Sequence, residues 1–205
     1  NDDSFLRERL GYSLFREMGV ATSRAMHARV VINGVFEGLF ILVEQIDGRL
    51  TRSRFTEGGK GNLYKEVWPI HANESTYLAA LESNRHENPS AQRMLDFRAA
   101  IGQGLAATEA WLDRDYMLRY IAVDRVIVND DGIFQWWCTP QGQGNNPGGR
   151  GNHNYYWYEA ANDNRMWLLP WDLDHSFQAN AIVHVSPEWS STGFGICSCG
   201  FGTSI

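Results

Sequence analysis

The sequence predicts an α+β fold in which antiparallel strands come first along the chain and helices dominate its middle. Asn33–Gly34 stands between the apolar runs 28–32 and 38–44, and Asn-Gly in such a setting is the strongest short-range signal of a β-hairpin. A second hairpin is predicted from 155–158 and 166–169, which alternate in the manner of half-buried strands. No repeat or linker interrupts the chain, so we expect a single domain.

The N-terminal segment 4–18 is predicted to be a helix. Leucines recur there at every fourth position from Leu6 to Leu14, and Gly19 follows as a stop signal. After the first hairpin, a glycine cluster leads into residues 62–67, where the pattern indicates another strand. The first third of the chain is therefore predicted to be a small antiparallel sheet with one helix.

The middle of the chain changes to helical patterns. Residues 74–83 and 91–100 are predicted to be helices, separated by the polar segment 84–90. Asp113 is a suitable N-cap for a longer helix that runs to about Ile127.

That longer helix leads into two adjacent carboxylates, Asp130 and Asp131, just before Gly132. The helix dipole disfavours negative charge at a C-terminus, so a cation or a hydrogen-bond donor is expected beside them. A solvated acidic end of the helix is the alternative interpretation.

Composition excludes several classes of function. The formal net charge is −6 and no Lys/Arg-rich run occurs, which argues against a nucleic-acid partner. No stretch approaches the roughly 20 apolar residues that a membrane span needs. The 3 cysteines, at 138, 197 and 199, leave open a disulfide, free thiols or a zinc site completed by His153 or His175. Residues 141–152 read as a long Gly- and Asn-rich loop.

Oxygen ligands for a hard cation occur at the ends of successive predicted elements. Asp131, Asn154 and Asp172 follow one another in the order of base, amide ligand and metal carboxylate in a kinase-like site. Asp174 is a further candidate metal ligand. Each also has a structural explanation, because Asn and Asp commonly satisfy backbone groups in turns.

Phosphoryl transfer also needs a cation on the phosphates. Lys65, within the predicted strand 62–67, is the candidate for that role, and Glu44 is its candidate ion-pair partner. Arg24 is assigned to nucleotide binding together with them. A solvated strand lysine is the alternative for Lys65.

The chain resembles the spore coat protein H (CotH) family of atypical secreted or surface protein kinases. The matching motifs are spread in order along most of the chain: Leu10–Phe15 with Gly19, Val31–Gly34, Gly38–Asp47, Gly61–Lys65, Val128–Asp131, His153–Tyr156 and Pro170–Asp174.

The resemblance implies a distant relative of the protein kinase fold that binds ATP with Mg²⁺ or Mn²⁺ and phosphorylates Ser or Thr of a coat or surface protein. It implies that Asp131 is the catalytic Asp, that Asp172 binds the metal with Asn154, and that Lys65 contacts the phosphates. Residues 1–70 would form a small N-terminal lobe and 71–205 a mostly helical lobe whose hairpin carries the metal site.

The family has further strands before the region that matches Asn1, so we expect part of the small lobe to be missing from this chain. A secreted or cell- or spore-surface location and a monomeric state are also expected.

Two other functions remain open from the sequence. Some family members act as adhesin-like modules without catalysis, and Trp136, Trp137 and Trp157 are candidate aromatic platforms for a sugar or peptide. A glycoside hydrolase that uses Asp131 and Asp172 as its paired carboxylates is the third interpretation, and it would need neither nucleotide nor metal.

Overall fold

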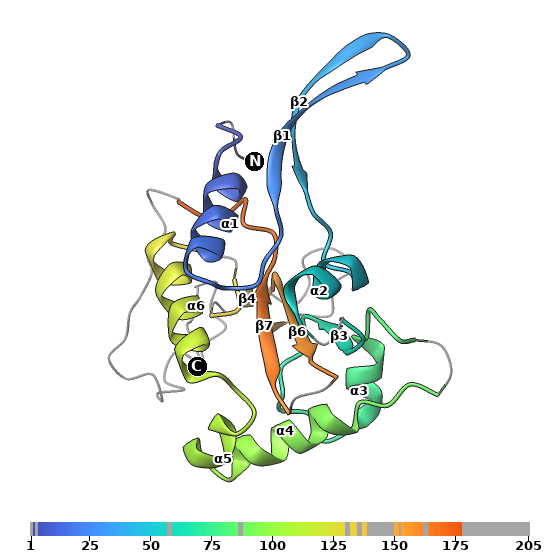
Figure 1. The fold of residues 1–205 in the computed structure, drawn as a ribbon, viewed down its shortest axis with the longest axis vertical. Helices are drawn as coiled ribbons and strands as arrows, with labels where there is room; N and C mark the ends of the chain where they lie inside the picture. The colour runs from blue at the N-terminus through green and yellow to red at the C-terminus, as the bar shows by residue number, and fades with distance from the viewer. Residues whose placement is uncertain are drawn as a thin grey trace.

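The fold is α+β, with small antiparallel sheets and several helices (Figure 1). The computed structural model describes residues 2, 4–56, 59–85, 88–129, 132–134, 137–138, 150–151, 153–161 and 164–177. In chain order its elements are α1 (Arg7–Glu17), β1 (Ala25–Ile32), β2 (Val35–Val43), α2 (Gly48–Arg54), β3 (Asn62–Lys65), α3 (Glu74–Ala79), α4 (Gln92–Gly102), α5 (Leu105–Glu109), α6 (Arg114–Val126), β4 (Trp137–Cys138), β5 (Arg150–Gly151), β6 (Tyr155–Glu159) and β7 (Met166–Pro170).

A three-stranded antiparallel sheet in the order β3-β6-β7 lies at the centre of the body. Its middle strand, β6, pairs through Tyr156 with Lys65 on one side and with Leu169 on the other. Every residue of β6 is buried, since both faces of the sheet are covered.

Each face of the sheet contributes to its own apolar cluster. The larger cluster contains Tyr64, Tyr155, Trp157 and Leu168 and packs against α1, α3, α4 and α6. The smaller one contains Leu63, Tyr156, Tyr158 and Leu169 of the sheet, together with Ile46 just before α2 and Leu50 within it. The aromatic side chains of the second hairpin are therefore core, and β6 is buried on both faces, whereas the alternation predicted a half-buried strand.

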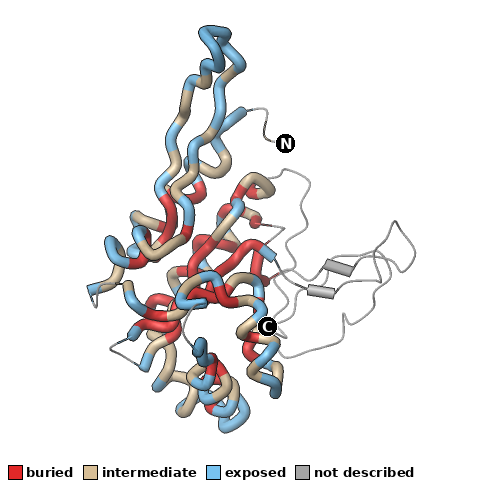
Figure 2. The backbone as a smooth tube through the Cα atoms, turned by 90° about the vertical axis from the view of Figure 1, so that its right-hand side faces the viewer, coloured by how far each residue is buried: buried red, intermediate tan, exposed pale blue. Residues whose placement is uncertain are grey.

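The first hairpin has the predicted turn but projects away from the body (Figure 1). Asn33 and Gly34 both have positive φ, of 52° and 84°, as the tight hairpin turn requires. Most of the hairpin's length is coloured as exposed or intermediate in Figure 2. Large apolar side chains are exposed on it, namely Met26, Val31, Ile32, Val35, Phe36, Leu39, Phe40 and Leu42.

Helix α1 forms where the leucine spacing predicts it, but with the opposite face inward. Leu6, Leu10 and Leu14 are all exposed, whereas Tyr12 and Phe15 are fully buried in the larger cluster. The leucine spacing located the helix correctly but does not mark its buried face, because that face is set by packing against α6, where Phe15 contacts Tyr120.

The third strand belongs to a different sheet from the one the sequence suggested. β3 does not extend the β1-β2 hairpin but pairs with β6, some 90 residues further along the chain. Two short helices, α2 and α5, were not predicted, and α3 ends at Ala79, before the predicted end at residue 83.

The predicted cap of the long helix is confirmed. The Asp113 carboxylate accepts a hydrogen bond from the Tyr116 N–H at 2.9 Å, and Arg165 pairs with its other oxygen at 2.7 Å. The predicted loop 141–152 lies almost entirely outside the described residues, as do Cys197 and Cys199. Over the described part of the chain, no helix combines the length and apolarity that a membrane crossing needs.

Gly61, at the start of β3, permits the close approach of β3 to β6. A Cβ atom at this position would lie 1.7 Å from the carbonyl oxygen of Glu159, which is backbone and has nowhere to move. We expect Gly61→Ala to lower the free energy of unfolding by about 2–3 kcal/mol in a chemical denaturation experiment. Gly102→Ala, at the end of α4 with no atom within 4 Å of the added methyl group, is the matched control and should cost nothing. Equal stability of the two variants would contradict this packing.

Candidate functional site

Three polar residues lie at one end of the central sheet, each where a strand starts or stops. Glu66 directly follows β3, Asn154 directly precedes β6, and Asp172 lies two residues beyond β7. The pairing of Lys65 with Tyr156 and of Tyr155 with Pro170 places these strand ends side by side. Carboxylate and amide oxygens therefore gather at this end of the sheet.

All three residues have left-handed backbone conformations, with φ of 52° for Glu66, 62° for Asn154 and 48° for Asp172. Residues other than glycine rarely adopt this region, and it costs about 1–3 kcal/mol where the fold imposes it. Such residues tend to gather at functional sites, so their concentration at this end of the sheet marks it as the candidate site.

Backbone hydrogen bonds fix the three strand ends to one another. The Asn154 N–H donates to the Glu66 carboxylate at 3.1 Å, and the Glu66 N–H donates to the Tyr155 carbonyl at 3.2 Å. The Trp171 N–H donates to the Asn154 carbonyl at 3.0 Å. Glu66 was not singled out from the sequence, because its role depends on a partner almost 90 positions away.

Helix α1 packs directly on the loop that carries Asp172. The Tyr12 hydroxyl accepts a hydrogen bond from the Asp172 N–H at 3.0 Å, and an Arg7 guanidinium nitrogen donates to the Asp174 carbonyl at 3.2 Å. Gly11 leaves room for the loop, since a Cβ atom there would come within 2.9 Å of the Leu173 side chain. The helix thereby holds Asp172 in its left-handed conformation.

Glu8, on the same helix, brings a further carboxylate to this end of the molecule. Burial, together with the negative charges of Asp172 and Asp174, raises the pKa of its carboxyl group to about 7. Glu8 was not singled out from the sequence, because an isolated helical glutamate does not reveal which loop it will face.

Lys65 lies at the last position of β3, beside the candidate site. Its ammonium is 4.0 Å from the Glu66 carboxylate and 6.0 Å from the centre of the Tyr156 ring. Trp171 packs edge-on against the same ring, with centroids 6.0 Å apart. Lys65 thus extends over the face of the sheet that also bears the smaller apolar cluster.

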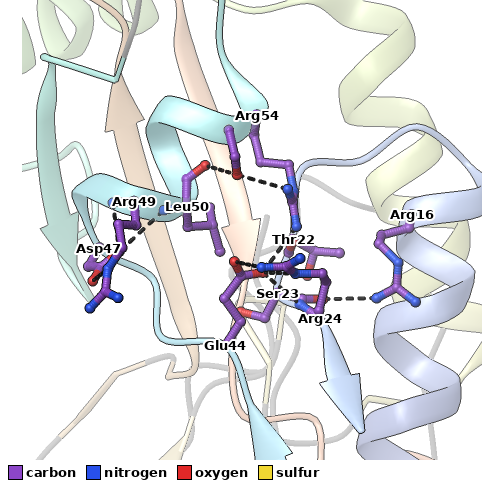
Figure 3. Close-up of polar contacts among 10 residues, drawn as sticks. Arg16, Thr22, Ser23, Arg24, Glu44, Asp47, Arg49, Leu50 and Arg54 are labelled. Atoms are coloured by element: carbon purple, nitrogen blue, oxygen red, sulfur yellow. Dashed lines mark hydrogen bonds and ion pairs between the residues drawn. The ribbon is translucent and has the colours of Figure 1, made fainter.

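The expected ion pair between Glu44 and Lys65 does not form. Glu44 lies at the base of the projecting hairpin and binds two guanidiniums, of Arg24 at 2.8 Å and of Arg54 at 3.0 Å (Figure 3). Burial alone would raise the pKa of the Glu44 carboxyl, but the hydrogen bonds and charges of these arginines hold that pKa below its ordinary value. Glu44 therefore ties the hairpin to α2, and it has no free charge to offer Lys65.

Arg24 and Glu44 line one concavity of about 600 Å³ between the base of the hairpin and α2. Asp47 lines it too and caps α2, accepting from the Arg49 N–H at 2.7 Å (Figure 3). Two of the three residues assigned to nucleotide binding thus share a hollow, whereas Lys65 is not among its lining residues.

Asp131 and its neighbour Asp130 lie outside the described residues, but the residue before them is held firmly. Asn129 is buried and donates to the fully buried Asp124 carboxylate at 2.9 Å. Burial raises the pKa of Asp124, and the adjacent Arg125, which donates to it at 3.0 Å, opposes that rise. The carbonyl of Ile127 accepts from the Phe177 N–H, so the end of α6 is joined to the segment that follows Asp174.

Comparison with known families gives a match over nearly all of the chain: residues 1–194 match the family described as CotH kinase protein. The chain belongs to the CotH kinase protein family. The resemblance read from the sequence motifs is therefore confirmed. A comparison with curated proteins finds no match.

In this CotH family member, the described side chains supply only part of the ligand set that a magnesium-like ion needs. Among the described residues, no three His, Cys, Asp or Glu side chains are grouped so as to hold a metal. Mg²⁺, however, usually binds through one or two carboxylates together with water and substrate phosphates, and Asp172 with the amide of Asn154 matches that requirement.

Two further sequence interpretations can be compared with the structure. Trp157 is 3% exposed in the larger apolar cluster, so it is not a platform for a sugar or peptide. Trp136 lies outside the described residues. His175 has its imidazole 3.9 Å from the Asp174 carboxylate, at the end of the loop that α1 supports.

The raised pKa of Glu8 predicts a pH-dependent stability. In the folded chain the proton is held up to about pH 7, whereas the ordinary pKa is 4.5, so wild-type stability is highest below pH 4.5 and falls as the pH rises to 7. Glu8→Gln removes this loss, and we expect the variant to be more stable than wild type at pH 8 but not at pH 4.5.

The measurement is urea denaturation of both chains at the two pH values. Glu17→Gln, an exposed position at the other end of α1, is the control and should show no such dependence. A stability difference between Glu8→Gln and wild type that is the same at pH 4.5 and pH 8 would contradict the assignment.

Proposed function

We propose that this chain is an ATP-dependent protein kinase of the CotH type, with Mg²⁺ or Mn²⁺ as its metal, which phosphorylates Ser or Thr of a coat or surface protein. The observation that carries the proposal is the position of Asn154 and Asp172. They are 18 residues apart in the sequence, yet the pairing of β6 with β7 sets them at the same end of one hairpin, beside Lys65. Family membership supports the kinase class in general.

The amide oxygen of Asn154 and the carboxylate of Asp172 are the proposed metal-holding groups, with Asp174 as a further carboxylate nearby. When bound, the metal ion would neutralise charge on the phosphates of ATP and fix their position. The two residues are suited to this because α1 and the sheet fix their backbones before any ligand arrives. Preorganised donors lose little entropy on binding.

Lys65 and Arg24 are the proposed contacts for the nucleotide. The side chain of Lys65 is 38% exposed, and its nearest carboxylate is at the limit of an ion pair, so its ammonium is accessible to a phosphate. Arg24 keeps 71% of its side chain exposed while it pairs with Glu44. The role of Glu44 in this scheme is to orient Arg24 and not to pair with Lys65.

Asp131 is the proposed catalytic residue. Its carboxylate would orient the substrate hydroxyl and take its proton as the hydroxyl oxygen forms a bond to the γ-phosphorus and the bond from that phosphorus to the bridging oxygen breaks. ADP is the leaving group, and the metal ion and Lys65 would neutralise the negative charge that develops on it. The Asp124–Asn129 pair supports the chain immediately before this residue.

The kinase-like lobes, the surface or secreted location and the monomeric state are part of the same proposal. Residues 1–70, with the β1-β2 hairpin and β3, would form the small lobe, and residues 71–205, with β6, β7 and most of the helices, the large lobe. An adhesin-like binding module on the same fold is the alternative, and nucleotide binding distinguishes the two, because a module without catalysis gains no stability from ATP with metal.

Asp172→Ala tests the proposal in a thermal-shift experiment. With wild type, ATP and MgCl₂ together should raise the melting temperature, since a ligand at a hundred times its dissociation constant stabilises by about 2.7 kcal/mol. Asp172→Ala should lose this shift, and it should also lose transfer of ³²P from labelled ATP to a Ser/Thr-rich protein such as casein.

Asp96→Ala, which removes an exposed carboxylate on α4, is the matched control and should keep both signals. Phosphoryl transfer by Asp172→Ala at the wild-type rate would rule out the assigned metal site. A wild-type chain that shows neither a shift nor transfer would favour the binding module.

A further inference from the structure

A second hollow lies away from the candidate metal site, between α1, α2, α6 and β7. Its volume is about 590 Å³, and it is lined by Arg16, Arg54 and Arg119 together with Phe55 and Trp167. We call it the arginine pocket. Glu66, Asn154 and Asp172 do not line it, and Trp167 pairs with Tyr158 towards the opposite end of the β6-β7 hairpin.

The guanidinium of Arg119 has no close ion-pair partner in the part of the chain that the structure describes, and the Asp113 carboxylate, which acts on it only through its charge, is itself paired with Arg165. It makes no hydrogen bond or ion pair there, and its Nε is buried without a partner. Charged side chains are rarely drawn into a fold unless something compensates them. Such an arginine in the wall of a hollow indicates that an anion completes the arrangement.

Arg16 is held toward the same hollow by neutral groups alone. One of its nitrogens donates to the Ser23 carbonyl at 3.0 Å (Figure 3), and another donates to the Ser13 hydroxyl at 3.4 Å. These bonds fix the direction of the guanidinium without neutralising its charge. Arg16 and Arg119 therefore both line the pocket without a close ion-pair partner among the described residues.

The carboxylates near the pocket are committed to other cations. Asp113, which lines the pocket, caps α6 and pairs with Arg165 at 2.7 Å. Glu44 binds Arg24 as well as Arg54, so its single negative charge does not fully neutralise Arg54, which also lines the pocket. The lining groups thus carry more positive than negative charge.

The other walls of the pocket are aromatic. The rings of Phe55 and Trp167 lie 5.6 Å apart, and Trp167 packs edge-on against Tyr116 with centroids 4.9 Å apart. An apolar wall lowers the local dielectric, so a charge-assisted hydrogen bond formed beside it is stronger than one in open water.

We propose that the arginine pocket binds a phosphate monoester dianion. Its two negative charges match the guanidiniums of Arg16 and Arg119, neither of which has a close ion-pair partner among the described residues, and the planar donor forks of arginine suit phosphate oxygens in pairs. A carboxylate would neutralise only one of the two. The proposal does not depend on catalysis by this chain, because none of the groups assigned to phosphoryl transfer lines the pocket.

The test is fluorescence anisotropy with a labelled peptide that carries one phosphoserine, measured with EDTA and without nucleotide, against the same peptide unphosphorylated. We expect the phosphorylated peptide to bind, its twin not to bind, and Arg119→Gln to weaken binding by about tenfold or more. Arg114→Gln, an exposed arginine of α6 paired with Glu109, is the matched control and should bind as wild type does.

Inorganic phosphate as competitor distinguishes the source of the dianion. Displacement only at concentrations far above that of the peptide assigns the pocket to peptide-borne phosphate, and displacement at comparable concentrations assigns it to free phosphate. Thr56→Glu places a carboxylate at the exposed rim without removing an arginine, so it weakens binding even if Arg119→Gln does not fold. Binding that neither Arg119→Gln nor Thr56→Glu reduces, or no binding of either phosphate probe, overturns the proposal.

Discussion

The burial of β6 on both faces is the constraint on which the rest of the structure depends. A strand whose residues are all buried must pair on both edges and be covered above and below, and β3, β7, the helices of the large cluster and the start of α2 meet these requirements. Because β6 is fixed in this way, so is Asn154 at its start. Packing of tyrosine and tryptophan side chains thus determines where a polar group is presented.

At the polar end of the sheet, this packing holds the candidate site residues in uncommon backbone conformations. Glu66, Asn154 and Asp172 occupy left-handed backbone conformations that are uncommon for residues other than glycine, and each is held by hydrogen bonds to a neighbouring strand end or to Tyr12. The stability of the two apolar clusters offsets this cost. Two other polar regions differ in their ion pairing: the Glu44 carboxylate pairs with both Arg24 and Arg54, whereas Arg16 and Arg119 in the arginine pocket have no close ion-pair partner among the described residues.

Features fixed by local interactions were predictable from the sequence, and features fixed by tertiary packing were not. The Asn33–Gly34 turn and the Asp113 cap depend on neighbours within a few residues, and both formed as predicted. The inward face of α1 and the sheet that contains β3 depend on partners far along the chain. The leucine spacing therefore did not predict the buried face of α1, and the strand order did not predict that β3 pairs with β6. Pairing Glu44 with Lys65 failed for the same reason, because two arginines lie closer to that carboxylate.

The central claim is that β6, β7 and α1 together form one cation site from Asn154 and Asp172. Paramagnetic broadening by Mn²⁺ in the presence of ATP, followed in the amide NMR spectrum, tests it most directly. The account predicts that the Asn154 and Asp172 resonances disappear first and that Glu159, about 17 Å away along β6, persists longest of these. Broadening that begins at Glu159 or elsewhere, with Asn154 and Asp172 unaffected, would contradict it.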